Sequence, residues 1–446
     1  MFLKNIFFIY LFLVLFFPFF LKIEINLFKI YLKDLLIFLF IFFLIYFHKL
    51  FDKKEKIEIK KIIFILILIY FFSIFFIYLK IIFNFQINLE LDMLDLNFFI
   101  YKFINLILRS IFITFGSISL YFLLCKLLDK KKILDLLIFY YFACMIIFLE
   151  FILHILLKEF YYDNPIIKKV YNLEIFRSIL LNGHIVTSIF LTIGFFVGFY
   201  LIKKLNYKFL IILNTFIILP VIYNLETRLT ILAFVYVGLL YLCIKFFNLK
   251  KINIKQHILT YAILILLIII FSNIDNLNIN KFTIQNVNIN TESLFDRINI
   301  NIISFFAFLN YPFGYGFEMF TAYLDFLYIP SIHLGNFNLK ELYGSFITFH
   351  NFEFLNIHKE FGRPHGSFLN ILTSFGIFIF PLYFSLRNFN RMQKKFNYDP
   401  DLNLLVKTCL LFIILASLVN YTFDIEILFV LISVFFVKLT KLKYES

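Results

Sequence analysis

The sequence predicts an all-α polytopic membrane protein of about twelve transmembrane helices, with one large loop between the ninth and tenth. Hydrophobic residues make up 62% of the chain, and the mean hydropathy is +0.92. A soluble domain could not cover that much apolar surface with polar residues. Apolar stretches of about 17 to 25 residues also recur along the chain, which is the length that a membrane-spanning helix needs.

The first apolar run, residues 5–21, has only Lys4 before it and no small-residue cleavage site after it. We therefore expect a first spanning helix there and not a cleaved signal peptide. Hydropathy alone sets the other spans. The predicted spans begin near residues 5, 34, 62, 98, 134, 184, 209, 229, 257, 366, 404 and 426.

Lysine and arginine orient these spans. The segments on the side of the N-terminus hold about 25 of these residues, against about 13 in the longer connections on the other side. Because positive residues accumulate on the cytoplasmic side of membrane proteins, both termini are predicted to be cytoplasmic. The same bias accounts for the net charge of +14, which is then no sign of nucleic-acid binding. The predicted cytoplasmic segments are Lys4, 48–61, 126–133, 203–208, 245–256, 387–403 and the tail from Lys438.

The chain divides into three predicted parts. Residues 1–271 form transmembrane helices 1–9, residues 272–365 form the large outer loop, and residues 366–446 form helices 10–12 with a cytoplasmic tail. The aromatic segments of the loop are expected to pack as a small cap on the membrane face. A transporter of two six-helix halves usually has its long connection in the centre, so a late outer loop favours an asymmetric enzyme.

Arginines recur at the predicted outer ends of the helices. Arginine near apolar surface is costly and usually paired, and its rigid fork matches the oxygens of a phosphate group. Several such residues in one cavity would make a diphosphate site, although local pairs such as Arg228 with Glu226 are an alternative. The candidate diphosphate-binding residues are Arg177, Arg228, Arg297 and Arg363.

His365 is the strongest candidate for catalysis. It ends the outer loop and precedes an apolar run that contains Gly376, beside the cation Arg363. Histidine titrates near neutral pH and can accept a proton from an attacking hydroxyl. The same loop also contains His333, His350 and His358, which spacing alone does not rank.

Two further features bear on the chemistry. Gly314 and Gly316 in NYPFGYGFEMF predict a tight turn with close backbone approach, but the lysine and Ser/Thr of a phosphate-binding P-loop are absent. The four cysteines lie in or at the ends of apolar runs, and residues 22–33 offer no acidic pair. We therefore expect no disulfide framework, no metal and no cofactor.

Arg109 lies inside the predicted fourth span. A charged residue within the membrane is costly, so this position makes Arg109 a functional candidate. A structural role is equally compatible with this position. The side chain could extend to the membrane surface, or it could balance a buried acid such as Glu150.

Four segments resemble the O-antigen ligase and O-antigen polymerase superfamily of bacterial inner membranes. HGSFLNILTSFGIFIFPLYF (365–384) resembles the family segment that follows its large periplasmic loop. The proline- and glycine-containing segment of the family is similar to residues 297–320, RININIISFFAFLNYPFGYGFEMF. Its segment with an arginine followed by leucines is similar to residues 224–242, NLETRLTILAFVYVGLLYL. FRSILLNGHIVTSIFL (176–191) is a weaker likeness, and the first 150 residues match only as generic spans.

The resemblance implies a membrane glycosyltransferase. Its donor would be a glycan on undecaprenyl diphosphate, with the diphosphate held by Arg228 and by Arg177 or Arg297. His365 would assist attack of an acceptor hydroxyl on the anomeric carbon, with inversion and without a metal.

Three functions remain open. A ligase would transfer the glycan to lipid A–core, and a polymerase would extend one lipid-linked chain with another. A lipid-linked glycan flippase or other transporter is the alternative of a different class, because Lys102, Arg109 and Lys407 fall within predicted spans. The implied location is the bacterial inner membrane.

Overall fold

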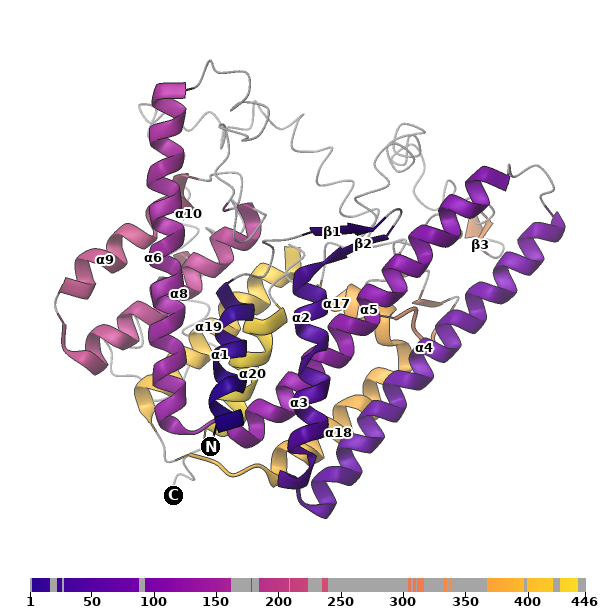
Figure 1. Cartoon of the computed structure of the whole chain (residues 1–446), viewed down its shortest axis with the longest axis horizontal. Coiled ribbons are helices and arrows are strands. Elements are labelled where there is room, and N and C mark those ends of the chain that lie inside the picture. Colours follow the sequence, from indigo (N-terminus) through magenta and orange to yellow (C-terminus); the bar gives the residue numbers. More distant parts are fainter. Residues whose placement is uncertain are drawn as a thin grey trace. The chain divides into compact units, whose positions relative to one another are not determined.

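The computed structural model describes most of the predicted helices and part of the connecting segments (Figure 1). The chain forms two compact units, which are described separately. Unit 1 comprises residues 1–133, 299–397 and 426–446, and unit 2 comprises residues 134–298 and 398–425. The described residues are 2–16, 22–25, 28–87, 93–161, 178, 184–207, 209–223, 235–239, 304–305, 308–309, 311–316, 333–334, 337–338, 367–396, 399–419 and 426–439.

Unit 1 is built around two long helices, α4 (Lys53–Ile87) and α5 (Met93–Leu127). Helix α5 packs against α2 (Leu32–Phe38), α3 (Phe40–Phe47) and α20 (Glu426–Lys438), whereas α4 packs against α18 (Ile379–Met392). The remaining elements are α1 (Phe2–Phe16), η1 (His48–Leu50), α17 (Ser367–Phe375), η5 (Gly376–Phe378) and the strands β1 (Lys22–Ile25), β2 (Phe28–Tyr31), β3 (His333–Leu334) and β4 (Phe337–Asn338).

Unit 2 contains α8 (His184–Leu205), which packs against α9 (Phe209–Ile217), α10 (Leu219–Tyr223) and α19 (Pro400–Val419), together with most of α6 (Lys130–Tyr161). Gly194 and Gly198 let α8 approach its neighbours closely. A Cβ atom at Gly194 would overlap Sγ of Cys144 on α6, and one at Gly198 would overlap Oδ1 of Asn214 on α9. Small residues at this four-residue spacing are typical of helix contacts in membranes, where backbones must come close to gain packing energy.

The described helices have the character of a membrane protein. Four of them are long and apolar enough to cross a bilayer, and large apolar side chains such as Phe64 and Phe380 are 60% and 65% exposed. An exposed phenylalanine surface of this kind is stable against lipid and unfavourable in water. The four candidate spans are Ile107–Leu127, Lys130–Leu157, Val186–Leu205 and Leu369–Met392.

The predicted total of about twelve spans stays a prediction. Described helices occur at most of the predicted positions, but the span near 257 lies outside the described residues, and only 235–239 of the span near 229 are described. One boundary differs clearly. Helix α4 begins at Lys53, so it includes most of the charged segment that was predicted to connect two spans. Lysine and glutamate are good helix formers, and the ion pair of Glu58 with Lys61 (2.9 Å) supports this first part of the helix.

A short hairpin stands where the first outer connection was predicted. Strands β1 and β2 pair antiparallel, with Glu24 opposite Lys29 in the register. The alternation of polar and apolar residues in KIEI favours a strand, although four residues are too few to identify one from sequence.

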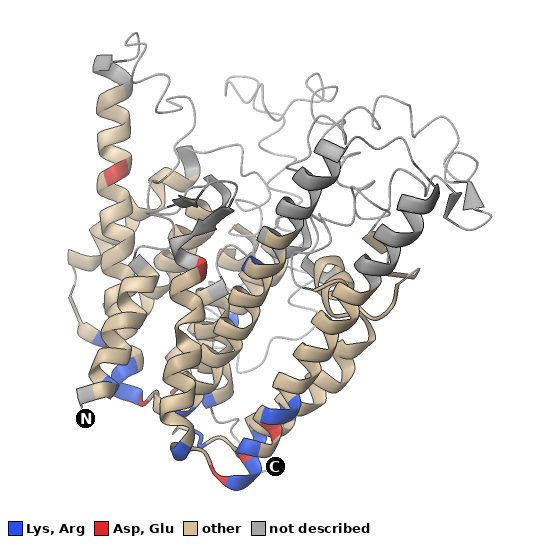
Figure 2. Cartoon of the chain, turned by 45° about the vertical axis from the view of Figure 1, so that its right-hand side comes forward, with Lys and Arg blue, Asp and Glu red and all other residues tan. Residues whose placement is uncertain are grey.

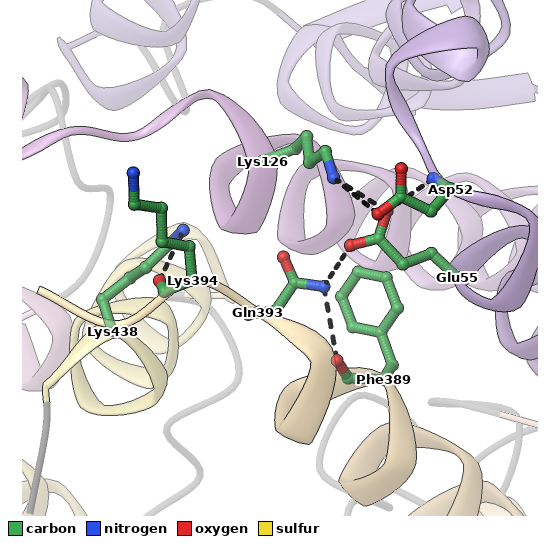
Figure 3. A network of polar contacts seen from close by, with 7 residues as sticks. All are labelled: Asp52, Glu55, Lys126, Phe389, Gln393, Lys394 and Lys438. Carbon is green, nitrogen blue, oxygen red and sulfur yellow. Dashed lines mark hydrogen bonds and ion pairs between the residues drawn. The ribbon is translucent and has the colours of Figure 1, made fainter.

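Within unit 1, charged residues are concentrated at helix ends and are sparse along the helices (Figure 2). A group of polar contacts centres on Glu55, a 2% exposed residue in the first turn of α4 (Figure 3). Its carboxylate accepts hydrogen bonds from the Asp52 backbone N–H (2.8 Å), Lys126 Nζ (2.8 Å) and Gln393 Nε2 (3.0 Å). Asp52 and Glu55 thereby make one half of a capping box at the start of α4.

These contacts tie together helix ends that are far apart in sequence. Lys126 belongs to the end of α5 and Gln393 follows α18, while Lys438 at the end of α20 donates to the backbone oxygen of Lys394 (3.3 Å). Lys4 of α1 also pairs with Asp129 (3.4 Å). Residues of several segments that the charge pattern assigned to one side of the membrane, namely Lys4, 48–61, 126–133, 387–397 and Lys438, are therefore linked to one another within unit 1. Which side of the membrane this is stays a prediction.

Burial raises the pKa of the Glu55 carboxyl, but the hydrogen bonds from Lys126, Asp52 and Gln393 outweigh it and hold the pKa below its usual range. A carboxyl group with a lowered pKa stabilises the fold above its ordinary titration range, and that contribution disappears as the pH falls through the lowered pKa.

We therefore expect Glu55→Gln to reduce the unfolding free energy by about 2 kcal/mol at pH 7, because it leaves Lys126 without its buried anion. Thermal unfolding of the purified protein in detergent measures this, and the difference from wild type should shrink as the pH falls. Lys4→Gln is the control, since its pair with Asp129 is exposed and should contribute less than about 1 kcal/mol. Equal effects of the two substitutions would contradict the central role of Glu55.

Candidate functional site

A break divides the apolar stretch Leu369–Met392 into two helices. Helix α17 ends at Phe375, a single 3-10 turn follows at Gly376–Phe378, and α18 continues from Ile379. Gly376 has a φ of +54°, a left-handed conformation that ends the hydrogen-bond ladder of α17. A helix that ends in apolar surroundings must find other partners for its last carbonyl groups.

Those partners come from residues 311–316, in the large loop. The N–H of Tyr315 donates to the carbonyl of Thr373 (2.8 Å), and the N–H of Gly316 donates to the carbonyl of Ser374 (2.9 Å). In the other direction, the N–H of Ile377 donates to the carbonyl of Pro312 (2.8 Å). Three backbone hydrogen bonds thus join the loop to the helix break.

Glycine is required on both sides of this contact. Gly314 and Gly316 have φ values of 89° and 94°, as a tight turn of this kind needs. A Cβ atom at Gly314 would lie 2.7 Å from the carbonyl oxygen of Ser374, and one at Gly376 would overlap the carbonyl oxygen of Pro312. The two backbones are therefore too close for any side chain between them.

The side chains of the turn are anchored in unit 1. Tyr315 is completely buried, and its carbonyl accepts a hydrogen bond from the Ser73 hydroxyl of α4. Phe313 stacks on Phe72 of α4, with ring centroids 5.5 Å apart, and Phe72 also stacks on Phe378 at 6.1 Å. The turn is thus held between α4 and the broken helix.

This arrangement modifies the predicted cap. The turn contacts residues that lie inside the apolar stretch Leu369–Met392, so this part of the loop reaches between helices. Non-helical backbone is tolerated at membrane depth only where protein surrounds it, and the burial of Tyr311, Gly314, Tyr315 and Gly316 meets that condition.

Three polar residues cover one side of α17. Asn370, Thr373 and Ser374 are all buried, with exposures of 2%, 0% and 0%. The hydroxyl of Thr373 donates to the carbonyls of Leu369 (2.9 Å) and Asn370 (3.1 Å), and that of Ser374 to Oδ1 of Asn370 (3.3 Å). Polar groups therefore accumulate next to the break.

The partner of Arg109 differs from the one that was proposed from sequence. Its Nε lies 3.0 Å from Oδ2 of Asp34, whose side chain is fully buried at the start of α2. Glu150 instead accepts a hydrogen bond from the Ser178 hydroxyl (2.5 Å) in unit 2. Arg109 lies near the middle of α5 (Met93–Leu127). Close contact of α2 with α5 at Gly116, whose Cβ would overlap the backbone of Ile37, fixes this pairing.

Most residues predicted for the site lie outside the described residues. This holds for His365, Arg363, Arg297, Arg228 and Arg177, so their proposed convergence stays a prediction. Only Gly314 and Gly316 are described, and α17 begins at Ser367, shortly after His365 in the chain. Among the described residues, no group of three or more His, Cys, Asp or Glu side chains is arranged to hold a metal ion.

Sequence inspection missed Ser73, Asn370 and Ser374 as parts of this site. A weak signal exists for two of them, because Asn370 and Ser374, together with Thr373, fall at the three- and four-residue spacing that places polar residues on one side of a helix. No comparable signal marks Ser73 as the partner of the turn. Comparison of the chain with protein-family models, curated proteins and solved structures gives no match.

We expect Gly376→Ala to destabilise unit 1 by about 2 to 4 kcal/mol, because it combines left-handed strain with a clash against Pro312. The loop should also become more sensitive to limited proteolysis as it detaches from the break. Gly238→Ala is the matched control, since its Cβ would meet nothing within 4 Å among the described residues. Equal unfolding midpoints for the two variants would contradict the proposed docking.

Proposed function

We propose that this protein is an O-antigen ligase-like glycosyltransferase of the bacterial inner membrane, with both termini in the cytoplasm. It transfers a glycan from undecaprenyl diphosphate to a lipid A–core acceptor, with inversion and without a metal. One observation carries the proposal. The turn at Gly314–Gly316 and the break at Gly376 belong to two segments that resemble the same superfamily, and they are joined by backbone hydrogen bonds.

The contact supports a site at this place for a physical reason. A broken helix in a membrane protein has helix ends, and backbone polar groups without helical partners, inside an apolar environment. Such helix ends and polar groups commonly form binding sites. His365 precedes the first turn of α17 in the chain, so the loop and the break together would fix the start of this helix. A catalytic group needs such positioning to within a fraction of an ångström.

The proposed step is a direct displacement. The acceptor hydroxyl oxygen bonds to the anomeric carbon while the bond from that carbon to the diphosphate oxygen breaks. The hydroxyl proton passes to the imidazole of His365, and the electron pair leaves with undecaprenyl diphosphate. The leaving group gains negative charge, which the guanidinium groups of Arg228, Arg177, Arg297 and Arg363 stabilise.

A polymerase is the nearest alternative, since it uses the same donor and differs only in its acceptor. Reconstitution with a lipid-linked glycan and each acceptor in turn separates the two: transfer to lipid A–core supports the ligase, and chain extension supports the polymerase. A flippase is less favoured. Arg109, one of the cations that would line its path, is paired with Asp34.

His365→Ala should lower the glycan transfer rate in reconstituted vesicles by about 10² to 10⁴, because the variant lacks the proposed base. Donor binding should change little, since the imidazole acts on the acceptor. His48→Ala is the control. His48 is an exposed histidine that is distant from His365 in the sequence, so its substitution should leave transfer unchanged. Near-normal transfer by the His365 variant would remove this residue from the mechanism.

Arg228→Lys should reduce transfer almost as much as Arg228→Ala, because an ammonium group cannot make the paired hydrogen bonds of a guanidinium to a diphosphate. Steady-state assays at several donor concentrations measure the effect. Arg387→Lys, at an exposed position of α18, provides the control. A lysine variant at position 228 that keeps most of the activity would show that charge alone is enough.

A further inference from the structure

The side-chain amide of Asn370 is the least satisfied polar group near the helix break. Asn370 is 2% exposed, and its Oδ1 atom accepts a hydrogen bond from the Ser374 hydroxyl (3.3 Å). Its Nδ2 atom has no hydrogen-bond partner within the described part of the chain. This amide is therefore oriented by Ser374, while its donor group is unused.

An unused donor in such a place is costly. Leaving a buried amide without a partner forfeits the hydrogen bonds that it makes with water in the unfolded chain, and buried polar groups are nearly always paired. A leucine would fill a similar volume without this cost. An asparagine whose donor group contributes nothing to the fold at this position points to a partner that is bound there only during function.

The position of Asn370 indicates the chemistry of that partner. It lies in the first turn of α17, where the N–H groups of a helix have no acceptor within the helix and the helix dipole is positive. Donors that gather at such an end favour an anion. A lipid diphosphate combines negatively charged phosphate oxygens with an apolar tail, so it suits a donor that is buried in a largely apolar helix.

We propose that Nδ2 of Asn370 donates a hydrogen bond to a phosphate oxygen of the polyprenyl diphosphate. Asn370 is then a substrate-binding residue for the donor, and Ser374 is a positioning residue that holds the amide. This assignment rests on the proposed function, since it requires a lipid diphosphate in the site.

Asn214 offers a contrast within the same protein. It is also buried, at 2% exposure, and its Oδ1 atom has no hydrogen-bond partner among the described residues, but its Nδ2 donor is used, since it donates to the carbonyl of Phe195 (3.0 Å). Its amide thus has a structural role between α9 and α8. Removing it should cost stability, whereas removing the amide of Asn370 should not.

The test measures stability and binding for the same variants of the full chain in detergent. Asn370→Leu should keep or raise the unfolding midpoint and weaken binding of undecaprenyl diphosphate by about tenfold to a hundredfold, the loss expected for a hydrogen bond to a charged group. Asn370→Asp, which has no donor and adds a negative charge, should weaken binding further. Asn214→Leu should lower the midpoint and leave the affinity unchanged.

Two further ligands identify what the amide recognises. Undecaprenyl monophosphate and free inorganic pyrophosphate should bind less tightly than the lipid diphosphate, and Asn370→Leu should reduce the preference for the diphosphate over the monophosphate.

The outcomes separate the two proposals. Wild-type glycan transfer with unchanged lipid diphosphate affinity in Asn370→Leu would overturn the assignment of Asn370 and leave the proposed function standing. A large loss of stability in Asn370→Leu with unchanged affinity would show that the amide is structural. Wild-type protein that binds no lipid diphosphate would overturn both proposals.

Discussion

The requirement that every backbone polar group in apolar surroundings be hydrogen-bonded determines the architecture around the candidate site. A left-handed glycine at position 376 ends α17. The carbonyls of Thr373 and Ser374 then have no N–H donor in their own helix. Residues 312–316 satisfy these groups and receive one hydrogen bond in return. The break and the turn are therefore stable only together, and this dependence links the large loop to a membrane helix.

Much of the fold follows from the periodic and compositional properties of the sequence. Apolar runs predicted helices where the structure has α1, α5, α6, α8, α19 and α20. The residues that meet around Glu55 come from segments that the charge pattern placed on one side of the membrane, and that placement stays a prediction. The features that were missed depend on contacts between distant segments. The close packing of Gly194 and Gly198 against α6 and α9 is an example, because the GFFVG spacing suggests a helix contact without naming the partner.

The candidate site was predictable to a smaller extent, for the same reason. The spacing of Gly314 and Gly316 indicates a tight turn, since few other residues adopt positive φ values. Its docking on Thr373 and Ser374 uses backbone atoms, which all residues share, so no residue type marks the partner. The pairing of Arg109 shows the same limit. Asp34 and Glu150 are both acidic residues within apolar segments, and only the packing of α2 on α5 decides between them.

The helix break also has an electrostatic consequence for the proposed chemistry. A continuous helix from Ser367 to Met392 would have one positive and one negative end, whereas the break makes α17 a short helix with its own dipole. Its positive end is the end that follows His365 in the chain. A positive potential favours the charged form of a phosphate group. Under the proposed function, the same helix end would therefore attract the diphosphate that leaves.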